Sequence, residues 1–266
     1  MDNPKDEIII LPHFLLMKEY LKIAKEEENL FNFYYKSLES FDKVFFDSQQ
    51  NFGIFINDNN KSLSGRYAYI ILQTKNALDS FFSHYFILKN GLCNSSIPNM
   101  RYFYETLLKN YFYLTLPAGE KDLVRYHGTQ ARDVRNRLYN LQSLENSHRK
   151  LYSMLSKKSH AGIISCAPSY ECSPSMYMDS LETGIYLLHG YFVFLLECFN
   201  QFISTEDREQ IKRFFGEFDN IFKVIPSFIP DREDIVPLLK FQNIRLVTPV
   251  NVDEFKRDKK EYLENS

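Results

Sequence analysis

The chain has 266 residues, of which 44% are hydrophobic and 16% aromatic, with 24 Phe, 18 Tyr and no Trp. Bulky rings must therefore fill much of a globular interior, and this composition excludes an intrinsically disordered chain. A net charge of −2 at pH 7 also argues against a protein that coats nucleic acid or membrane over its whole surface.

Cysteine content and hydropathy predict where the protein works. The four cysteines lack regular spacing and no apolar leader follows the acidic start, so we expect a reducing, cytoplasmic location. The longest apolar run, 185–199, contains His189, Gly190 and Glu197. It is shorter than the roughly 20 residues that cross a bilayer. We therefore predict a buried core helix there and no membrane contact.

Helical periodicity dominates the first part of the chain. Apolar residues from His13 to about Asp47 recur at helical spacing around an acidic interruption at 26–28, which predicts one long helix or two. The stretch 52–63 is rich in Asn and Asp and is typical of a loop.

The next two segments predict an antiparallel helical pair. The first helix runs from Ser64 to Lys89, where Asn90-Gly91 supplies a C-terminal stop. The second is expected after Ser95 and Ser96, with Pro98 in its first turn. The apolar stripe assigned to the first helix consists of Tyr67, Ile71, Leu78, Phe82, Tyr85 and Phe86.

Four further helices complete the predicted bundle, and the last has a cap at Ser204 and Thr205 ahead of acidic residues. Four prolines after residue 225 favour a mostly irregular extension, with one candidate short strand at 244–247. We predict an all-α bundle of about seven helices over 1–225 and an extension, 226–266, that packs on the bundle or binds a partner. The four helices are expected at 120–142, 145–160, 178–203 and 206–222.

Two charged residues share a face of the helix predicted after Ser96. Arg101 falls within the apolar arc and Glu105 lies one turn further on, at the margin of that arc. The Arg-before-Glu order is the weaker one for a surface pair, so helix stabilisation alone does not explain it. A partly buried arginine needs a partner. Glu105 is therefore either a structural partner or a residue that orients the guanidinium toward a ligand.

The stretch YSMLSKKSHAG places Tyr152, Ser156 and His160 on one helical stripe, together with Arg149. A histidine beside a hydroxyl is a candidate general base or acid, because its reference pKa lies near neutrality. The alternative is that His160, which is followed by Ala-Gly, only interacts with the carbonyls of a helix C-terminus.

No metal or cofactor is expected. His160, Cys166 and Cys172 lack the close spacing of structural zinc ligands, and such cysteines are more often small buried apolar residues. The sequence contains no glycine-rich phosphate loop, no GxSxG and no HExxH motif. Nucleotide-fuelled chemistry and zinc peptidase chemistry therefore have no support.

Residues 121–160 carry nine Lys or Arg against three acids, a local net charge of +6. Such a segment could follow the phosphates of a nucleic acid, with tyrosines stacked on its bases. The alternative is a solvated basic face. The candidate nucleic-acid-binding residues are Arg132, Arg135, Arg149 and Lys157.

The Arg101-x3-Glu105 helix and the Leu155-Ser156-x3-His160 helix together resemble a family of uncharacterised helical microbial proteins with R-x3-E and L-S-x3-H helices. A more distant resemblance is to the HEPN superfamily of helical bundles, many of which are metal-independent ribonucleases of toxin and phage-defence systems. Its Arg and His are separated by about four to six residues, whereas ten residues separate Arg149 from His160 here. Arg101 would have to supply the guanidinium from a neighbouring helix.

These observations predict a polar centre of Arg101, Glu105, Tyr152, Ser156 and His160. The function we expect from it is RNA binding, or metal-independent RNA cleavage, in a defence or toxin setting. The alternative is a non-catalytic protein–protein interaction module in which the same residues form a buried polar network. The partners considered are RNA, a protein that binds the C-terminal extension, and a second copy of the chain in a homodimer.

Overall fold

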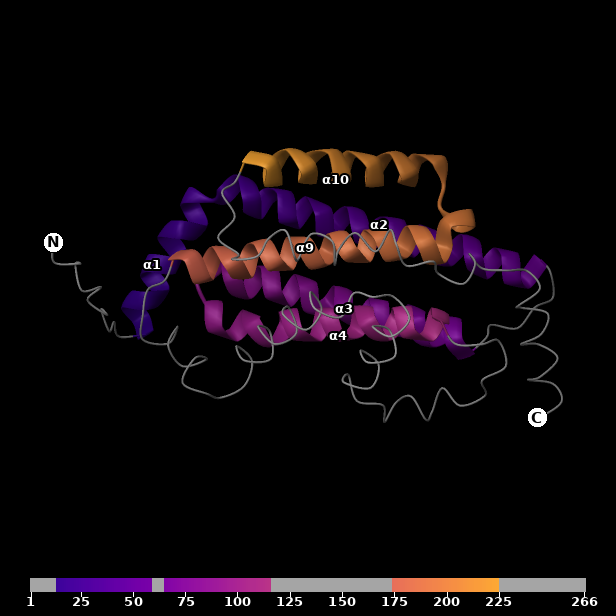
Figure 1. Cartoon of the computed structure of the whole chain (residues 1–266), viewed down its shortest axis with the longest axis horizontal. Helices are drawn as coiled ribbons and strands as arrows, with labels where there is room; N and C mark the ends of the chain where they lie inside the picture. Colours follow the sequence, from indigo (N-terminus) through magenta and orange to yellow (C-terminus); the bar gives the residue numbers. More distant parts are fainter. Residues whose placement is uncertain (1–12, 59–64, 116–173, 225–266) are drawn as a thin grey trace, which may run out of the picture.

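Six α-helices and a short 3₁₀ turn make up the computed structural model over the residues that it describes, 13–58, 65–115 and 174–224 (Figure 1). These ranges contain no strand, so the prediction of an all-α fold is confirmed. The helices predicted at 120–142 and 145–160 and the extension 226–266 lie outside the described residues. The helices are α1 (His13–Glu26), α2 (Glu28–Asp58), α3 (Gly65–Lys89), α4 (Cys93–Thr115), α9 (Pro174–Phe199) and α10 (Thr205–Val224).

The first predicted segment forms two helices, α1 and α2, which meet at Glu27 within the acidic interruption. The Glu27 amide closes the last turn of α1 on the carbonyl of Ile23 at 2.9 Å, and the Glu27 carbonyl accepts from the amide of Leu30 at 3.0 Å. Each helix then buries a separate apolar face, which includes Leu16 and Tyr20 on α1.

The helix α2 continues to Asp58, so the prediction of a loop from residue 52 is wrong for 52–58. Phe52 and Ile56 are buried one helical turn apart, and the ring of Phe52 lies 5.0 Å from that of Phe202 and 5.5 Å from that of Tyr67. Asn51 also donates to the carbonyl of Phe202 at 2.8 Å. Tertiary packing therefore outweighs the low helix propensity of Asn and Asp.

The helices α3 and α4 form the predicted antiparallel hairpin, joined by only three residues. Gly91 has a φ of 75°, in the left-handed region that favours glycine. Its amide donates to the carbonyl of Leu88 at 2.8 Å, and the amide of Leu92 donates to that of Ile87 at 3.0 Å. This pair of bonds is the Schellman C-cap that Asn90-Gly91 predicts.

The start of α4 differs from the prediction. The helix begins at Cys93, so Pro98 lies inside it rather than in its first turn. The hydroxyl of Ser96 donates to the carbonyl of Cys93 at 2.6 Å, and both side chains are buried. Since proline has no amide hydrogen, the helix lacks the bond that residue 98 would otherwise donate to the carbonyl four residues earlier.

The helix α9 packs against α2, α3 and α4, and α2 also contacts α3 directly, so these four helices form the core of the bundle (Figure 1). Its residues 180–188 are all buried, so the prediction of a core helix over 185–199 is confirmed. None of the described helices is long and apolar enough to cross a membrane. A 3₁₀ turn, η2 (Asn200–Phe202), ends the helix a few residues before the predicted boundary.

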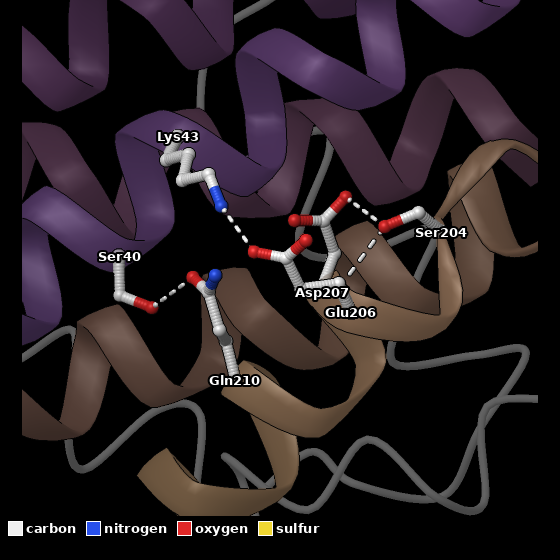
Figure 2. A network of polar contacts seen from close by, with 6 residues as sticks. All are labelled: Ser40, Lys43, Ser204, Glu206, Asp207 and Gln210. Carbon is white, nitrogen blue, oxygen red and sulfur yellow. Dashed lines mark hydrogen bonds and ion pairs between the residues drawn. The ribbon is translucent and has the colours of Figure 1, made fainter.

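The helix α10 packs on the outside of α2 through a row of polar contacts shown in Figure 2. The hydroxyl of Ser204 accepts from the amide of Asp207 at 3.1 Å and donates to its carboxylate at 2.7 Å, which confirms the predicted cap. Lys43 pairs with Glu206 at 3.0 Å, and Ser40 donates to Gln210 at 3.4 Å. We call the four residues Ser40, Lys43, Glu206 and Gln210 the α2–α10 seam.

Candidate functional site

The structure describes two of the five residues of the predicted polar centre, Arg101 and Glu105. The other three, and all four candidate nucleic-acid-binding residues, lie outside the described residues, as do all three groups considered for a metal, His160, Cys166 and Cys172. Within the described ranges, no group of three or more His, Cys, Asp or Glu side chains is arranged to hold a metal ion. The residues not described are Tyr152, Ser156, His160, Arg132, Arg135, Arg149 and Lys157.

The predicted pair of Arg101 and Glu105 forms on α4. Arg101 Nε donates to Glu105 Oε1 at 2.8 Å, and the two side chains are 25% and 21% exposed. Three neighbours on the same helix, Met100, Phe103 and Tyr104, are buried. The pair therefore lies at the border of the apolar face, where the sequence places Glu105, whereas Arg101 was expected within the apolar arc.

The chemistry open to this pair follows from its geometry. A charge-assisted bond from Nε fixes the plane of the guanidinium and so sets the direction of its remaining donors. The carboxylate also neutralises much of the positive charge, so any anion must compete with Glu105 for Arg101. The pair can orient a guanidinium, and it can equally stabilise α4 without a ligand.

A second polar cluster, which the sequence analysis did not identify, joins four helices around His84. The phenol of Tyr34 on α2 lies 3.1 Å from His84 Nδ1, and Ser180 Oγ on α9 lies 3.4 Å from His84 Nε2. The hydroxyls of Ser180 and Ser96 are 2.8 Å apart. We call Tyr34, His84, Ser96 and Ser180 the His84 junction.

The close approach of α9 to His84 depends on Gly184. A Cβ atom at this position would lie 2.6 Å from His84 Cε1 and 2.9 Å from the hydroxyl of Tyr34, closer than real Cβ contacts. The ring of Phe103 on α4 packs edge-on against the imidazole at 5.5 Å. Glycine thus leaves room for an imidazole that three neighbouring helices surround.

Burial sets the protonation state of the junction. His84 and Tyr34 are both fully buried. Burial lowers the pKa of His84 from its ordinary 6.5 to about 3 and raises the pKa of the Tyr34 phenol well above its ordinary value. Both side chains are therefore neutral at physiological pH.

The order Ser180, His84, Tyr34 is that of a nucleophile, a base and a group that orients the base. However, none of the four side chains of the junction is more than 2% exposed. Two cavities lined by described residues lie elsewhere, one of about 390 Å³ between α2 and α10 and one of about 20 Å³ between α1 and the start of α4. In the part of the chain that the structure describes, the junction is closed to solvent, and its geometry is that of a structural hydrogen-bond network.

The sequence contains a signal for His84 that our apolar stripe for α3 missed. His84 lies three residues after Phe81, four before Leu88 and seven after Ala77, all of which are buried. The predicted stripe instead included Phe86, which is 53% exposed, and Ile71 and Phe82, which are only partly buried. Treating histidine as a core residue at this spacing would have rotated the stripe to the observed face.

Comparison of this chain with protein-family models, with curated proteins and with solved structures found no match, so the resemblances stated for the sequence stay predictions.

Proposed function

We propose that the chain binds RNA through a polar centre to which α4 contributes Arg101, and that any cleavage at this centre is independent of metal ions. The observation that supports the proposal is the Arg101–Glu105 pair: a guanidinium only 25% exposed, with its plane fixed by a bond of 2.8 Å. Arginine held in this way presents donors that suit a phosphate. In cleavage, such a group would stabilise the charge of the pentacoordinate phosphorus, and His160 would transfer the proton.

The test is binding of a labelled mixed-sequence single-stranded RNA to the full-length protein in EDTA, at several salt concentrations. Arg101→Gln should weaken binding at low salt by about tenfold or more, and it should reduce the salt slope by about one phosphate contact. The matched control is Arg213→Gln, because Arg213 is exposed on α10 and far along the chain from the pair. Equal affinity of the Arg101 variant and the wild type would reject the proposal.

Glu105→Gln separates the RNA-binding role from a purely structural one. If Arg101 binds phosphate, removal of the neighbouring carboxylate should maintain or strengthen RNA affinity, since one competing negative charge is lost. If the pair only stabilises α4, Arg101→Gln and Glu105→Gln should lower the melting temperature alike and leave RNA binding unaffected. Cleavage of the same RNA by wild type but not by His160→Ala would extend the proposal to catalysis.

A second proposal is a non-catalytic interaction module, and the sealed His84 junction favours it. The polar groups of the junction are all buried, which is what a network that fixes helix register requires and a catalytic centre does not. On this proposal a protein partner binds the C-terminal extension. Removal of residues 226–266 should then abolish partner binding while the helical content and the urea midpoint of the remaining chain stay those of the bundle.

A further inference from the structure

We propose that the His84 junction is a one-way chain of hydrogen bonds that holds α2, α3, α4 and α9 together only while the imidazole is neutral, so that the junction acts as an acid-sensitive latch. The chain runs from the Tyr34 hydroxyl through His84, Ser180 and Ser96 to the carbonyl of Cys93. Its direction follows from counting the protons available at each step.

The donors and acceptors can be assigned from the carbonyl end of the chain of hydrogen bonds. The carbonyl of Cys93 can only accept, so the single hydroxyl proton of Ser96 is used in the 2.6 Å bond to it. The 2.8 Å contact between Ser96 and Ser180 must then use the proton of Ser180. The thioether of Met100, 3.7 Å from Ser180 Oγ, is a weak acceptor and does not compete.

The same count determines the tautomer of His84. Because the hydroxyl of Ser180 donates to Ser96, it can only accept a hydrogen bond from His84 Nε2. The hydrogen of the neutral ring is therefore on Nε2. His84 Nδ1 is then the acceptor, and the hydroxyl of Tyr34 donates to it at 3.1 Å. In each hydrogen bond of the junction, the donor and the acceptor are therefore defined.

A second proton on the ring breaks this chain. It must attach to Nδ1, which then donates toward the hydroxyl of Tyr34, so that the Tyr34 proton has to turn away from its only acceptor in the junction. Among the described residues, the groups against the ring are the phenol of Tyr34 from α2, the ring of Phe103 from α4, and Ser180 and Gly184 from α9. Tyr34 is the one titratable group among them, and it is neutral.

No negative charge among these groups compensates an imidazolium. Glu182 is a buried carboxylate on α9, but it lies two residues from Ser180 and so about 200° around the helix. Burial accordingly lowers the pKa of His84 to about 3. In the unfolded chain the ring is solvated, and its pKa returns to about 6.5. Between these two pH values the unfolded chain binds one proton more than the folded one.

The sign of the effect is therefore fixed. The stabilisation from a neutral His84 is fully present above about pH 6.5 and is lost as the pH falls toward 3. Because unfolding binds one extra proton, the unfolding equilibrium constant rises about tenfold for each unit by which the pH falls within this range.

The experiment is urea unfolding of the full-length protein from pH 8 to pH 4.5, with His84→Gln and, as a control, His189→Gln. His189 lies on the same helix as Ser180 but faces the rings of Phe215 and Phe218. Below about pH 6.5, wild type and the His189 variant should show the tenfold change per pH unit in addition to the carboxylate contribution, and the His84 variant should lack it. Parallel pH profiles for wild type and His84→Gln would overturn the proposal.

Histidine-ring spectra of the wild-type protein, assigned with Tyr34→Phe, give a second test, which stands even if His84→Gln does not fold. Two-bond ¹H–¹⁵N spectra of the histidine rings should show one ring fixed in the Nε2–H form and not titrating between pH 8 and pH 5. Tyr34→Phe identifies that ring, because it removes only the hydroxyl that donates to Nδ1. An Nδ1–H tautomer, or titration of this ring near pH 6.5, would overturn the direction of the chain.

Discussion

The His84 junction and the α2–α10 seam both join helices through polar side chains, but they do so in opposite surroundings. The junction is uncharged, fully buried and built around a glycine that admits an imidazole. The seam is open to solvent, and its ion pair between Lys43 and Glu206 has side chains that are 49% and 77% exposed. Burial makes an unpaired polar group costly, whereas water replaces a lost surface contact at little cost.

This difference ranks the regions by how much a single substitution should matter. A change at the junction leaves an unfilled or crowded space that four packed helices cannot easily relieve. A change at the seam only removes one of several contacts that hold α10, whose apolar side packs separately on α9 through Phe214, Phe218 and Phe222. The following substitutions test that ranking from its strongest consequence to its weakest.

Gly184→Ala should have the largest effect, a loss of about 1–3 kcal/mol in the free energy of unfolding. The new methyl group would press on His84 and Tyr34, and neither ring can move without breaking the hydrogen bond between them. Gly216→Ala on α10 is the matched control, because a Cβ there meets nothing within 4 Å. It should stabilise the chain by about 0.5–1 kcal/mol through helix propensity. Equal urea midpoints for the two variants would contradict the close packing of α9 on His84.

Thr74→Val tests a second buried contact in the hairpin of α3 and α4. Asn110 Nδ2 donates to Thr74 Oγ1 at 3.0 Å, and both residues are buried. Valine keeps the shape but removes the acceptor, which should cost about 1–3 kcal/mol in the free energy of unfolding. Replacing both partners, as in Thr74→Val with Asn110→Leu, should recover much of this loss because no buried amide remains unpaired. A double variant less stable than the single one would show that the amide has another essential role.

Ser204→Ala removes the cap of α10 at the edge of the seam. The Asp207 amide loses the hydroxyl that accepts from it at 3.1 Å, so we expect a loss of about 1 kcal/mol and a fall of about 2–4 °C in the melting temperature. The control is Ser83→Ala in the interior of α3, where an exposed hydroxyl donates to the carbonyl of Asp79 at 2.9 Å. That change should leave stability unchanged or slightly higher, because alanine is the better helix former.

Local signals predicted the features that depend on a few neighbouring residues. The Schellman end of α3 at Gly91, the cap of α10 at Ser204 and the pair of Arg101 with Glu105 each follow from residues within one or two turns of a helix. These features could be derived because their partners are close in the sequence, and the structure confirms all three.

Features that depend on packing between distant segments could not be derived in the same way. The helix α2 extends beyond residue 52 because Phe52 packs on Phe202, 150 residues later in the chain. His84 is a core residue because Gly184, 100 residues away, leaves space for it. Neither partner is identifiable from periodicity, which reports the face of one helix but not the element that covers it.

The smallest change in stability is expected at the seam itself. Lys43→Ala removes the ion pair with Glu206, and it should shift the urea midpoint less than Ser204→Ala does, because solvated pairs contribute little. Any shift should disappear in 1 M salt, where the Debye length is only about 3 Å. The hydrogen bond to Glu206 raises the pKa of Lys43 above its ordinary 10.5, so the contribution of the charged Lys43 is present at neutral pH and is lost as the pH rises through that raised pKa. If Lys43→Ala instead destabilises the chain more than Gly184→Ala, α10 is held mainly by charge, and the ranking of the two regions is reversed.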